Sequence, residues 1–218
     1  LLLVSDPVPP TLSSLDRPLP RLPGARAESR AIGSLIPRPR VTALEDVAAG
    51  EGAVRAAAAG KSVLHFATHA VVRDDDPFSS FLAVGKTGAD DGLLTAREIY
   101  GLRLDADLVV LSACRSGSGR VIGDGIATFA RAFIYAGAPS IVASLWDVAD
   151  EPTNQLLPQF YRAWLGGASK ARALRAAQLR LLSELRAGKV RIETPAGLVS
   201  LPEHPVFWAG FALIGEPE

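Results

Sequence analysis

Two apolar stretches decide the fold of this chain, SVLHFAT (62–68) and DLVVLSA (107–113). Each is almost free of polar alternation, which is typical of a strand buried on both faces of a parallel sheet. A third stretch of this kind, SIVASLW (140–146), follows after a helical segment. Buried strands that alternate with helices predict a parallel sheet packed between two helical layers.

The segments around these strands continue the alternation. Further short strands are expected at 1–4, 40–44, 81–84 and 207–215. Helices are expected at 24–36, 46–59, 94–102, 124–136, 151–165 and 169–187. Asp46 and Thr95 are the expected N-caps of two of these helices. The predicted fold class is therefore α/β, a three-layer α/β/α sandwich with a mostly parallel central sheet.

The amino-acid composition argues against several classes of function. The 218 residues are 48% hydrophobic, and 23 basic residues balance 23 acidic ones, so nothing indicates a nucleic-acid or membrane-surface partner. The length fits one domain over 1–218, and no apolar run is long enough for a transmembrane helix. A single cysteine excludes an internal disulfide and suits a reducing, cytoplasmic location. Since the chain lacks methionine, we expect a fragment of a longer multidomain protein.

Two reactive side chains stand at strand ends. Cys114 follows the strand 107–113, and His69 follows the strand 62–68, 45 residues upstream. The carboxyl ends of parallel strands share one edge of a sheet, so the two side chains can meet there. A cysteine in Q-A-C-[RQG]-G with a histidine about 50 residues upstream is the caspase pattern. This chain has S-A-C-R-S at 112–116; the alternative for Cys114 is an inert core thiol.

Such a pair has a defined chemistry. A free thiol is weakly ionised near neutral pH, and a neighbouring imidazole raises its nucleophilicity and later protonates the leaving amine. The developing oxyanion needs two N–H donors, for which we expect the backbone amides of Cys114 and Ala70. This chemistry requires no cofactor.

Five segments in order resemble the successive blocks of CHAT domains, bacterial and fungal relatives of caspases and separase. They are HFATHA (65–70), DGLLTAREIYGL (91–102), DLVVLSACRSGSG (107–119), ARAFIYAGAPSIVASLWDVAD (130–150) and HPVFWAGFALIG (204–215). The resemblance implies a caspase-like cysteine peptidase with His69 and Cys114 as its dyad. It also implies regulated cleavage of partner proteins in bacterial signalling or defence, with tetratricopeptide repeats as neighbouring domains. Ala70 departs from the glycine that most members have.

The segment SLWDVAD (144–150) is also similar to a loop of separase, which cleaves after arginine. We therefore expect Asp147 or Asp150, with Asp150 favoured, to pair with a basic side chain of the substrate. The alternative is that both aspartates cap the following helix.

Other interpretations remain open. A latent or catalytically silent caspase-fold interaction domain would keep the same core. A flavodoxin-like ligand-binding domain shares the architecture, but AGKS (59–62) precedes a strand and makes no phosphate loop. His65 and His69 could together suggest a metal pair, but the sequence offers no recognisable third ligand. His65 is therefore expected to be a core histidine. His204 is expected to be structural.

Overall fold

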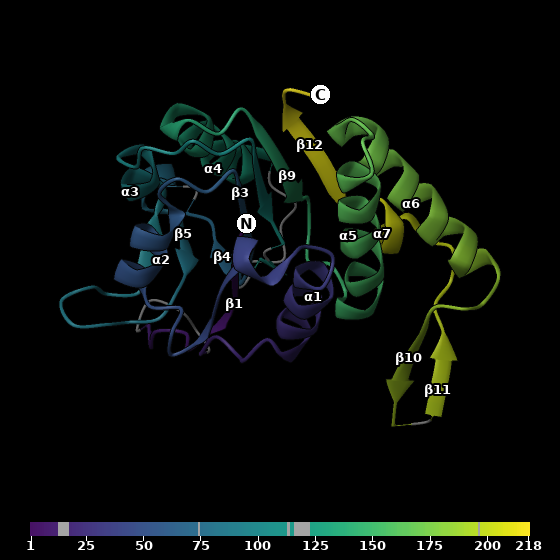
Figure 1. Cartoon of the computed structure of the whole chain (residues 1–218). Coiled ribbons are helices and arrows are strands. Elements are labelled where there is room, and N and C mark those ends of the chain that lie inside the picture. Colours follow the sequence, from purple (N-terminus) through teal and green to yellow (C-terminus); the bar gives the residue numbers. More distant parts are fainter. Residues whose placement is uncertain (13–17, 74, 113, 116–122, 196) are drawn as a thin grey trace.

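The computed structural model describes residues 1–12, 18–73, 75–112, 114–115, 123–195 and 197–218, with 114–115 and 123–125 described by their backbone alone. Six strands form the central sheet of this part. They are β1 (Leu2–Pro7), β2 (Thr42–Asp46), β3 (Val63–Ala67), β7 (Leu108–Leu111), β9 (Ser140–Ser144) and β12 (Phe211–Gly215). Their order is β12-β9-β7-β3-β1-β2, and only β12 is antiparallel to its neighbour. The predicted α/β class with a mostly parallel sheet is confirmed (Figure 1).

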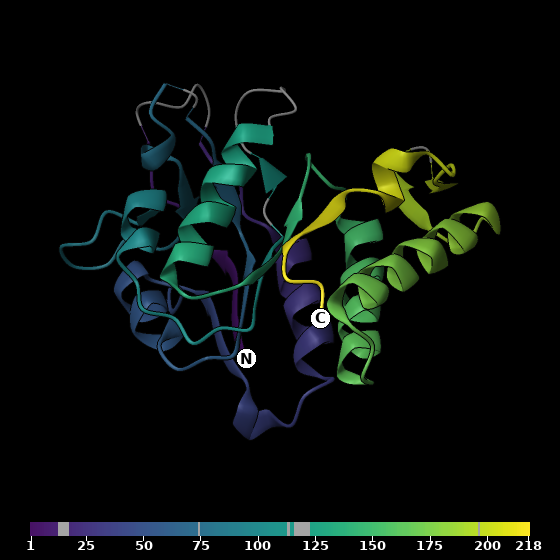
Figure 2. The ribbon, with the colours of Figure 1, turned by 90° about the horizontal axis from the view of Figure 1, so that it is seen from above.

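Helices cover both faces of this sheet. One layer consists of α1 (Pro23–Gly33), α5 (Asp150–Leu165) and α6 (Lys170–Arg186). The other consists of α2 (Glu51–Ala58), α3 (Ala96–Tyr100) and α4 (Gly123–Ala136). Figure 2 shows the sheet between the two layers, each of which packs over its own apolar core.

The strands read as apolar runs because they are buried on both faces. Leu64 and Phe66 of β3 pack into the core beneath α2, α3 and α4. Leu3 of β1 and Val110 of β7, the two strands that flank β3, pack into the core beneath α1, α5 and α6. Full burial of one such side chain contributes about 1.5–3 kcal/mol, so the sheet is a rigid base for the residues at its edge.

A second, smaller sheet continues from the carboxyl edge of the first. Its strands are β4 (His69–Val71), β5 (Phe81–Ala83), β6 (Leu93–Thr95) and β8 (Cys114–Arg115), in the order β6-β5-β4-β8. Thr68 lies between β3 and β4, and its hydroxyl donates to the carbonyl of Ala83 at 2.5 Å. The chain therefore passes from the large sheet to the small one directly before His69.

Several element boundaries differ from expectation. The helix predicted from Asp46 begins at Glu51 instead, because Asp46 ends β2 with a positive φ of 55° and Gly50 is the N-cap. Thr95 does cap α3, within a capping box that includes Glu98. The strand expected at 207–215 is shorter, because Pro205–Trp208 form the helix α7 and the strand β12 begins at Phe211. The remaining elements, which the sequence pattern did not indicate, are η1 (Arg38–Arg40), η2 (Pro77–Ser79), β10 (Arg191–Thr194) and β11 (Gly197–Ser200).

A glycine between α4 and β9 provides a test of this packing. Gly137 has a φ of +112°, and a Cβ there would overlap the carbonyl of Leu104. Gly167 has a similar φ of +98°, but a Cβ there meets no described atom within 4 Å. Gly167→Ala should therefore cost about 1–2 kcal/mol of unfolding free energy from backbone strain alone. Gly137→Ala should lower the unfolding free energy by at least about 2 kcal/mol more than Gly167→Ala does, because the added Cβ also overlaps Leu104. Urea denaturation of the two variants measures this difference. Equal losses would contradict the packing described.

Candidate active site

His69 is the buried residue that opens β4, with 4% of its surface exposed. Its Nε2 atom lies 2.7 Å from the carbonyl oxygen of Pro20. Because a carbonyl oxygen can only accept, Nε2 carries a proton and donates it. In the neutral ring Nδ1 is then the basic nitrogen, which is the atom able to take up a proton.

The protonation of His69 follows from its surroundings. Burial lowers the pKa of His69, because leaving water disfavours the charged imidazolium. The hydrogen bond to Pro20 and the negative charges of Asp6 and Asp147 raise it, without cancelling the effect of burial. The ring is therefore mostly neutral near pH 7, as a general base must be.

Cys114 opens β8, which runs parallel to β4. The register pairs His69 with Cys114 and Ala70 with Arg115. Neighbouring strands lie about 4.8 Å apart, so the backbones of the two predicted dyad residues are adjacent. The residues around β8, Ala113 and 116–122, lie outside the described part of the chain.

Ala70 lies in β4, beside the backbone of β8. Among the described residues other than glycine, positive φ angles occur at Asp6 and Asp46 only. Ala70 thus has an ordinary strand conformation, and the freedom of a glycine is not needed at this position in the observed backbone.

A buried carboxylate at the end of β1 holds the segment that contacts His69. Asp6 is 3% exposed, and its Oδ1 accepts hydrogen bonds from Arg21 Nε at 3.0 Å and from the Leu22 amide at 2.7 Å. Arg21 also donates to Asp6 Oδ2 at 2.8 Å and to the Asp6 carbonyl at 3.1 Å. Arg21 and Leu22 directly follow Pro20, so these bonds fix the carbonyl that accepts from His69.

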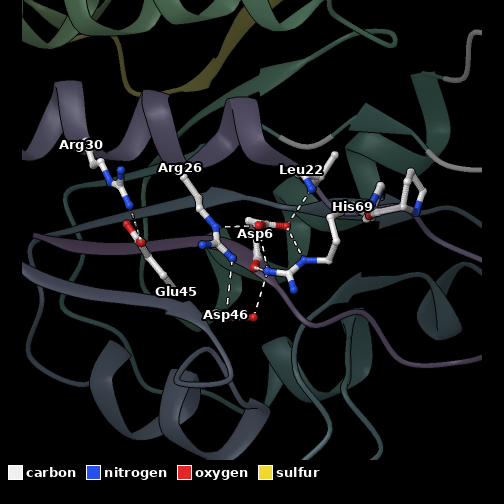
Figure 3. A network of polar contacts seen from close by, with 9 residues as sticks. Asp6, Leu22, Arg26, Arg30, Glu45, Asp46 and His69 are labelled. Atoms are coloured by element: carbon white, nitrogen blue, oxygen red, sulfur yellow. Dashed lines mark hydrogen bonds and ion pairs between the residues drawn. The ribbon is translucent and has the colours of Figure 1, made fainter.

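The network extends to the neighbouring strand and to α1. Arg26 Nε donates to Asp6 Oδ2 at 2.6 Å, and Arg26 also lies 3.7 Å from a carboxylate oxygen of Asp46. Farther along α1, Arg30 pairs with Glu45 at 3.6 Å. Figure 3 shows these partners joining α1 to the ends of β1 and β2. Ion pairs therefore tie α1 to the ends of β1 and β2, and the same network fixes the segment whose Pro20 carbonyl contacts His69.

A cavity with about 290 Å³ of empty space lies between α1 and α5 at the same edge. Thr68 and Ser112 belong to its wall. Thr68 precedes His69 directly, and Ser112 comes two residues before Cys114, so the cavity borders the dyad. Its wall also includes two carboxylates, Glu28 of α1 and Asp150 of α5.

The two aspartates of SLWDVAD take different places. Asp150 is exposed, begins α5 and lines the cavity. Gly24 makes room for it, because a Cβ at Gly24 would overlap the Asp150 carboxylate. Asp147 is exposed, does not line the cavity and acts on His69 through its charge. Neither aspartate is the N-cap of α5; that position belongs to Ala149.

A second cavity, with about 480 Å³ of empty space, lies under the helix α4 on the other face of the sheet. Its wall is mainly apolar and includes Ala70, Leu111, Phe129 and Trp146. Trp146 is held by a hydrogen bond from its indole N–H to the Val206 carbonyl at 3.0 Å.

Three contributors to the site escaped sequence analysis, namely Asp6, Pro20 and Glu28. Asp6 directly follows the apolar run LLLVS (1–5). His69 was identified because it is a polar residue at the end of a buried strand, and the same criterion applies to Asp6. Pro20 contributes only a carbonyl oxygen, which leaves no side-chain signal. Glu28 occupies a helix whose polar residues are otherwise mostly surface residues, and its burial depends on tertiary contacts.

The other histidines have the structural places expected for them. His65 is fully buried, and His204 caps α7 by accepting from the Val206 amide at 3.2 Å. The described residues contain no group of three His, Cys, Asp or Glu side chains that could hold a metal ion. No helix in the described ranges is both long and apolar enough to cross a membrane.

Comparison with solved structures identifies the fold. The crystal structure of the Arg specific cysteine proteinase gingipain R (RGPB) matches 99% of this chain, with a TM-score of 0.57 and 11% identity. The match covers 46% of the gingipain chain. At this identity the likeness shows the fold, which is that of the caspase-like α/β proteins.

The family follows from sequence comparison. The CHAT domain model matches residues 2–216, so the chain belongs to the CHAT domain family. Tetratricopeptide repeat protein 28 of Mus musculus is 35% identical over 123 residues, and that of Homo sapiens is 32% identical over 123 residues. These matches cover 56% of this chain but 4% of the length of the two relatives.

The charged network at Asp6 can be tested by removing its charge. Burial alone raises the pKa of Asp6, but hydrogen bonds from Arg21, Leu22 and Arg26 outweigh burial and lower it. The carboxylate therefore stabilises the fold above its unfolded pKa of about 3.9, and this stability is lost as pH falls through the lower folded value. Asp6→Asn keeps a side chain that tolerates positive φ and should cost about 2 kcal/mol at pH 7.

The measurement is urea denaturation of both proteins from pH 7 to pH 2. The difference in unfolding free energy between them should shrink as the pH approaches the folded pKa of Asp6. A difference that is independent of pH would show that the charge has no such role.

The influence of Asp147 on His69 is a second test. Asp147→Asn removes a negative charge that favours the imidazolium, so the pKa of His69 should fall further below its ordinary value. Titration of the His69 ring by NMR measures this shift directly. Asp105→Asn, at an exposed position at the opposite edge of the sheet, is the matched control and should leave the titration unchanged. A rise in the pKa of His69 in the Asp147 variant would contradict the assignment.

Proposed function

We propose that this chain is a cysteine endopeptidase in which Cys114 is the nucleophile and His69 the base. The observation that carries the proposal is the parallel register of β4 and β8, which pairs these two residues. The contact between His69 and Pro20 supports it, because it leaves Nδ1 as the nitrogen that accepts a proton. Membership of the CHAT family and the caspase-like fold support the same class of reaction.

The proposed reaction has two stages. The Cys114 thiol gives its proton to His69 as the sulfur attacks the peptide carbonyl, and the amides of Ala70 and Cys114 stabilise the oxyanion. His69 then protonates the leaving amine, so that an acyl-enzyme and a new amino terminus form. Water activated by His69 hydrolyses the thioester and restores the thiol. No cofactor enters either stage.

We further propose cleavage after a basic residue. The cavity beside the dyad has a carboxylate at its exposed side, Asp150, and a guanidinium can pair with it bidentately. The structural relative gingipain R is described as Arg specific. Asp147 lies outside the cavity wall, so Asp150 is the better candidate.

The natural substrates are proposed to be partner proteins. The two relatives are named for tetratricopeptide repeats, which supports the idea that such repeats accompany this domain and control its access to substrates. The domain itself would then be one unit of a larger protein.

A fluorogenic peptide panel tests the function. Peptides with arginine, lysine, aspartate or leucine before the scissile bond are offered to the wild-type chain and to Cys114→Ala. We expect cleavage after arginine by the wild type and none by the variant. Asp150→Asn should lower kcat/KM for arginine about tenfold, the effect of about 1.4 kcal/mol from one charge-assisted contact.

Asp105→Asn is the control for Asp150→Asn, since it removes an exposed charge that lies outside the cavity and at the opposite edge of the sheet from His69. Cleavage after aspartate, or cleavage that survives in Cys114→Ala, would contradict the proposal. An absence of cleavage, together with a Cys114 thiol that alkylates as slowly as a buried thiol, would indicate the catalytically silent interaction domain instead.

A further inference from the structure

The inner wall of the cavity beside the dyad contains a buried carboxylate. Glu28 on α1 lines this cavity and is 3% exposed. Its Oε2 accepts a hydrogen bond from the Ser112 hydroxyl at 2.9 Å. Its Oε1 lies 2.7 Å from His65 Nε2, yet neither of these two atoms makes a hydrogen bond of good geometry with the described residues.

Glu28 has no permanently charged cation as a partner among the described residues. Among the ion pairs of the described residues, its only partner is His65, which is also fully buried. The other ring nitrogen of His65 lies 3.2 Å from the hydroxyl of Tyr161. Burial, and then the charge of Glu28, raise the pKa of Tyr161 well above its ordinary value, so this phenol stays neutral. No arginine or lysine of the described residues pairs with Glu28, and a buried carboxylate that lacks such a permanent cation is costly to keep ionised.

The position of Glu28 explains how that cost can be offset. It shares the cavity with Asp150, which lies at the exposed side, while Glu28 is buried. Ala25 of α1 contributes a small side chain to the wall of the same cavity, and the Asp150 carboxylate packs against Gly24 at the start of α1. A cationic side chain entering past Asp150 would reach Glu28 at the inner end of the cavity.

We propose that Glu28 is a second specificity-determining residue of the substrate pocket, which selects arginine by placing one carboxylate at its entrance and one at its inner end. This inference rests on the proposed peptidase function for the identity of the ligand. A guanidinium has five N–H donors in a planar fork and can bridge two carboxylates. The lysine ammonium is a compact point charge and satisfies one carboxylate at a time. His65 and Ser112 act as positioning residues, because they hold the carboxylate of Glu28 in the wall.

A purely structural role for Glu28 is the competing explanation. In that case it would only tie α1 to β3 and to the end of β7 through His65 and Ser112. Glu28→Gln separates the two roles, because the amide keeps an oxygen that can accept from Ser112 but loses the negative charge. Glu51→Gln is the matched control, since Glu51 is also a glutamate with 2% exposure but lies on α2, away from the cavity.

The experiment measures binding, so it needs no turnover. Cys114→Ala protein is titrated by calorimetry with two peptides that differ only in arginine or citrulline before the scissile bond, citrulline being the uncharged isostere. We expect the arginine peptide to bind at least tenfold more tightly, and Glu28→Gln to lower this preference about tenfold. Glu51→Gln should leave the preference unchanged.

A second measurement covers the case in which Glu28→Gln does not fold. The arginine peptide should shift the NMR signals of the His65 ring in Cys114→Ala protein, because the guanidinium would bind to the carboxylate that lies beside this buried ring. The citrulline peptide should not shift them. A structural role alone predicts no such difference.

The outcomes separate this inference from the proposed function. If the chain binds the arginine peptide preferentially through Glu28 but never cleaves any peptide, the result supports the proposed pocket and overturns the proposed peptidase function. If the chain cleaves after arginine, and Glu28→Gln prefers arginine over citrulline as strongly as the parent protein does, the role of Glu28 is overturned and the peptidase function stands. Equal binding of both peptides to Cys114→Ala protein, with an unshifted His65 ring, would also overturn it.

Discussion

The site depends on an anion that has been taken out of water. Asp6, the second-last residue of β1, has a φ of 41°, in the left-handed region. Its buried carboxylate is stable there only because two arginines and a backbone amide donate to it. Those donors belong to the segment around Pro20 and to α1. The requirement to satisfy one buried charge thus fixes a loop, a helix and the carbonyl that orients His69.

The two sheets of the molecule have different structural roles. The six-stranded sheet is buried on both faces and supplies rigidity, while the four-stranded sheet places His69 and Cys114 on neighbouring strands. Thr68 marks the passage between them. On one side of this junction lies a cavity with two carboxylates, and on the other lies an apolar cavity beneath α4. The proposed chemistry and the proposed selectivity are therefore built on separate structural elements.

Sequence analysis reached the layers of the fold because buried parallel strands have a distinctive apolar pattern. It also placed His69 and Cys114 at one edge, since the carboxyl ends of parallel strands meet there. It could not anticipate the pairing of β4 with β8, because a strand of two residues has no periodicity. Asp46 was misassigned as a helix cap, since a polar residue before a helix looks the same when it ends a strand with positive φ. Glu28 was missed because its burial arises from partners that are distant in the sequence.

The scattered origin of the site has a consequence for how the chain is made. Its parts come from Asp6, Pro20, His69, Cys114 and Asp150, and none of them is held in place by neighbours in the sequence alone. Contacts over such separations form late, after long loops have closed. A chain that is still emerging from the ribosome or only partly folded has its reactive groups apart. Long-range topology thus delays the assembly of the candidate site until synthesis has passed α5.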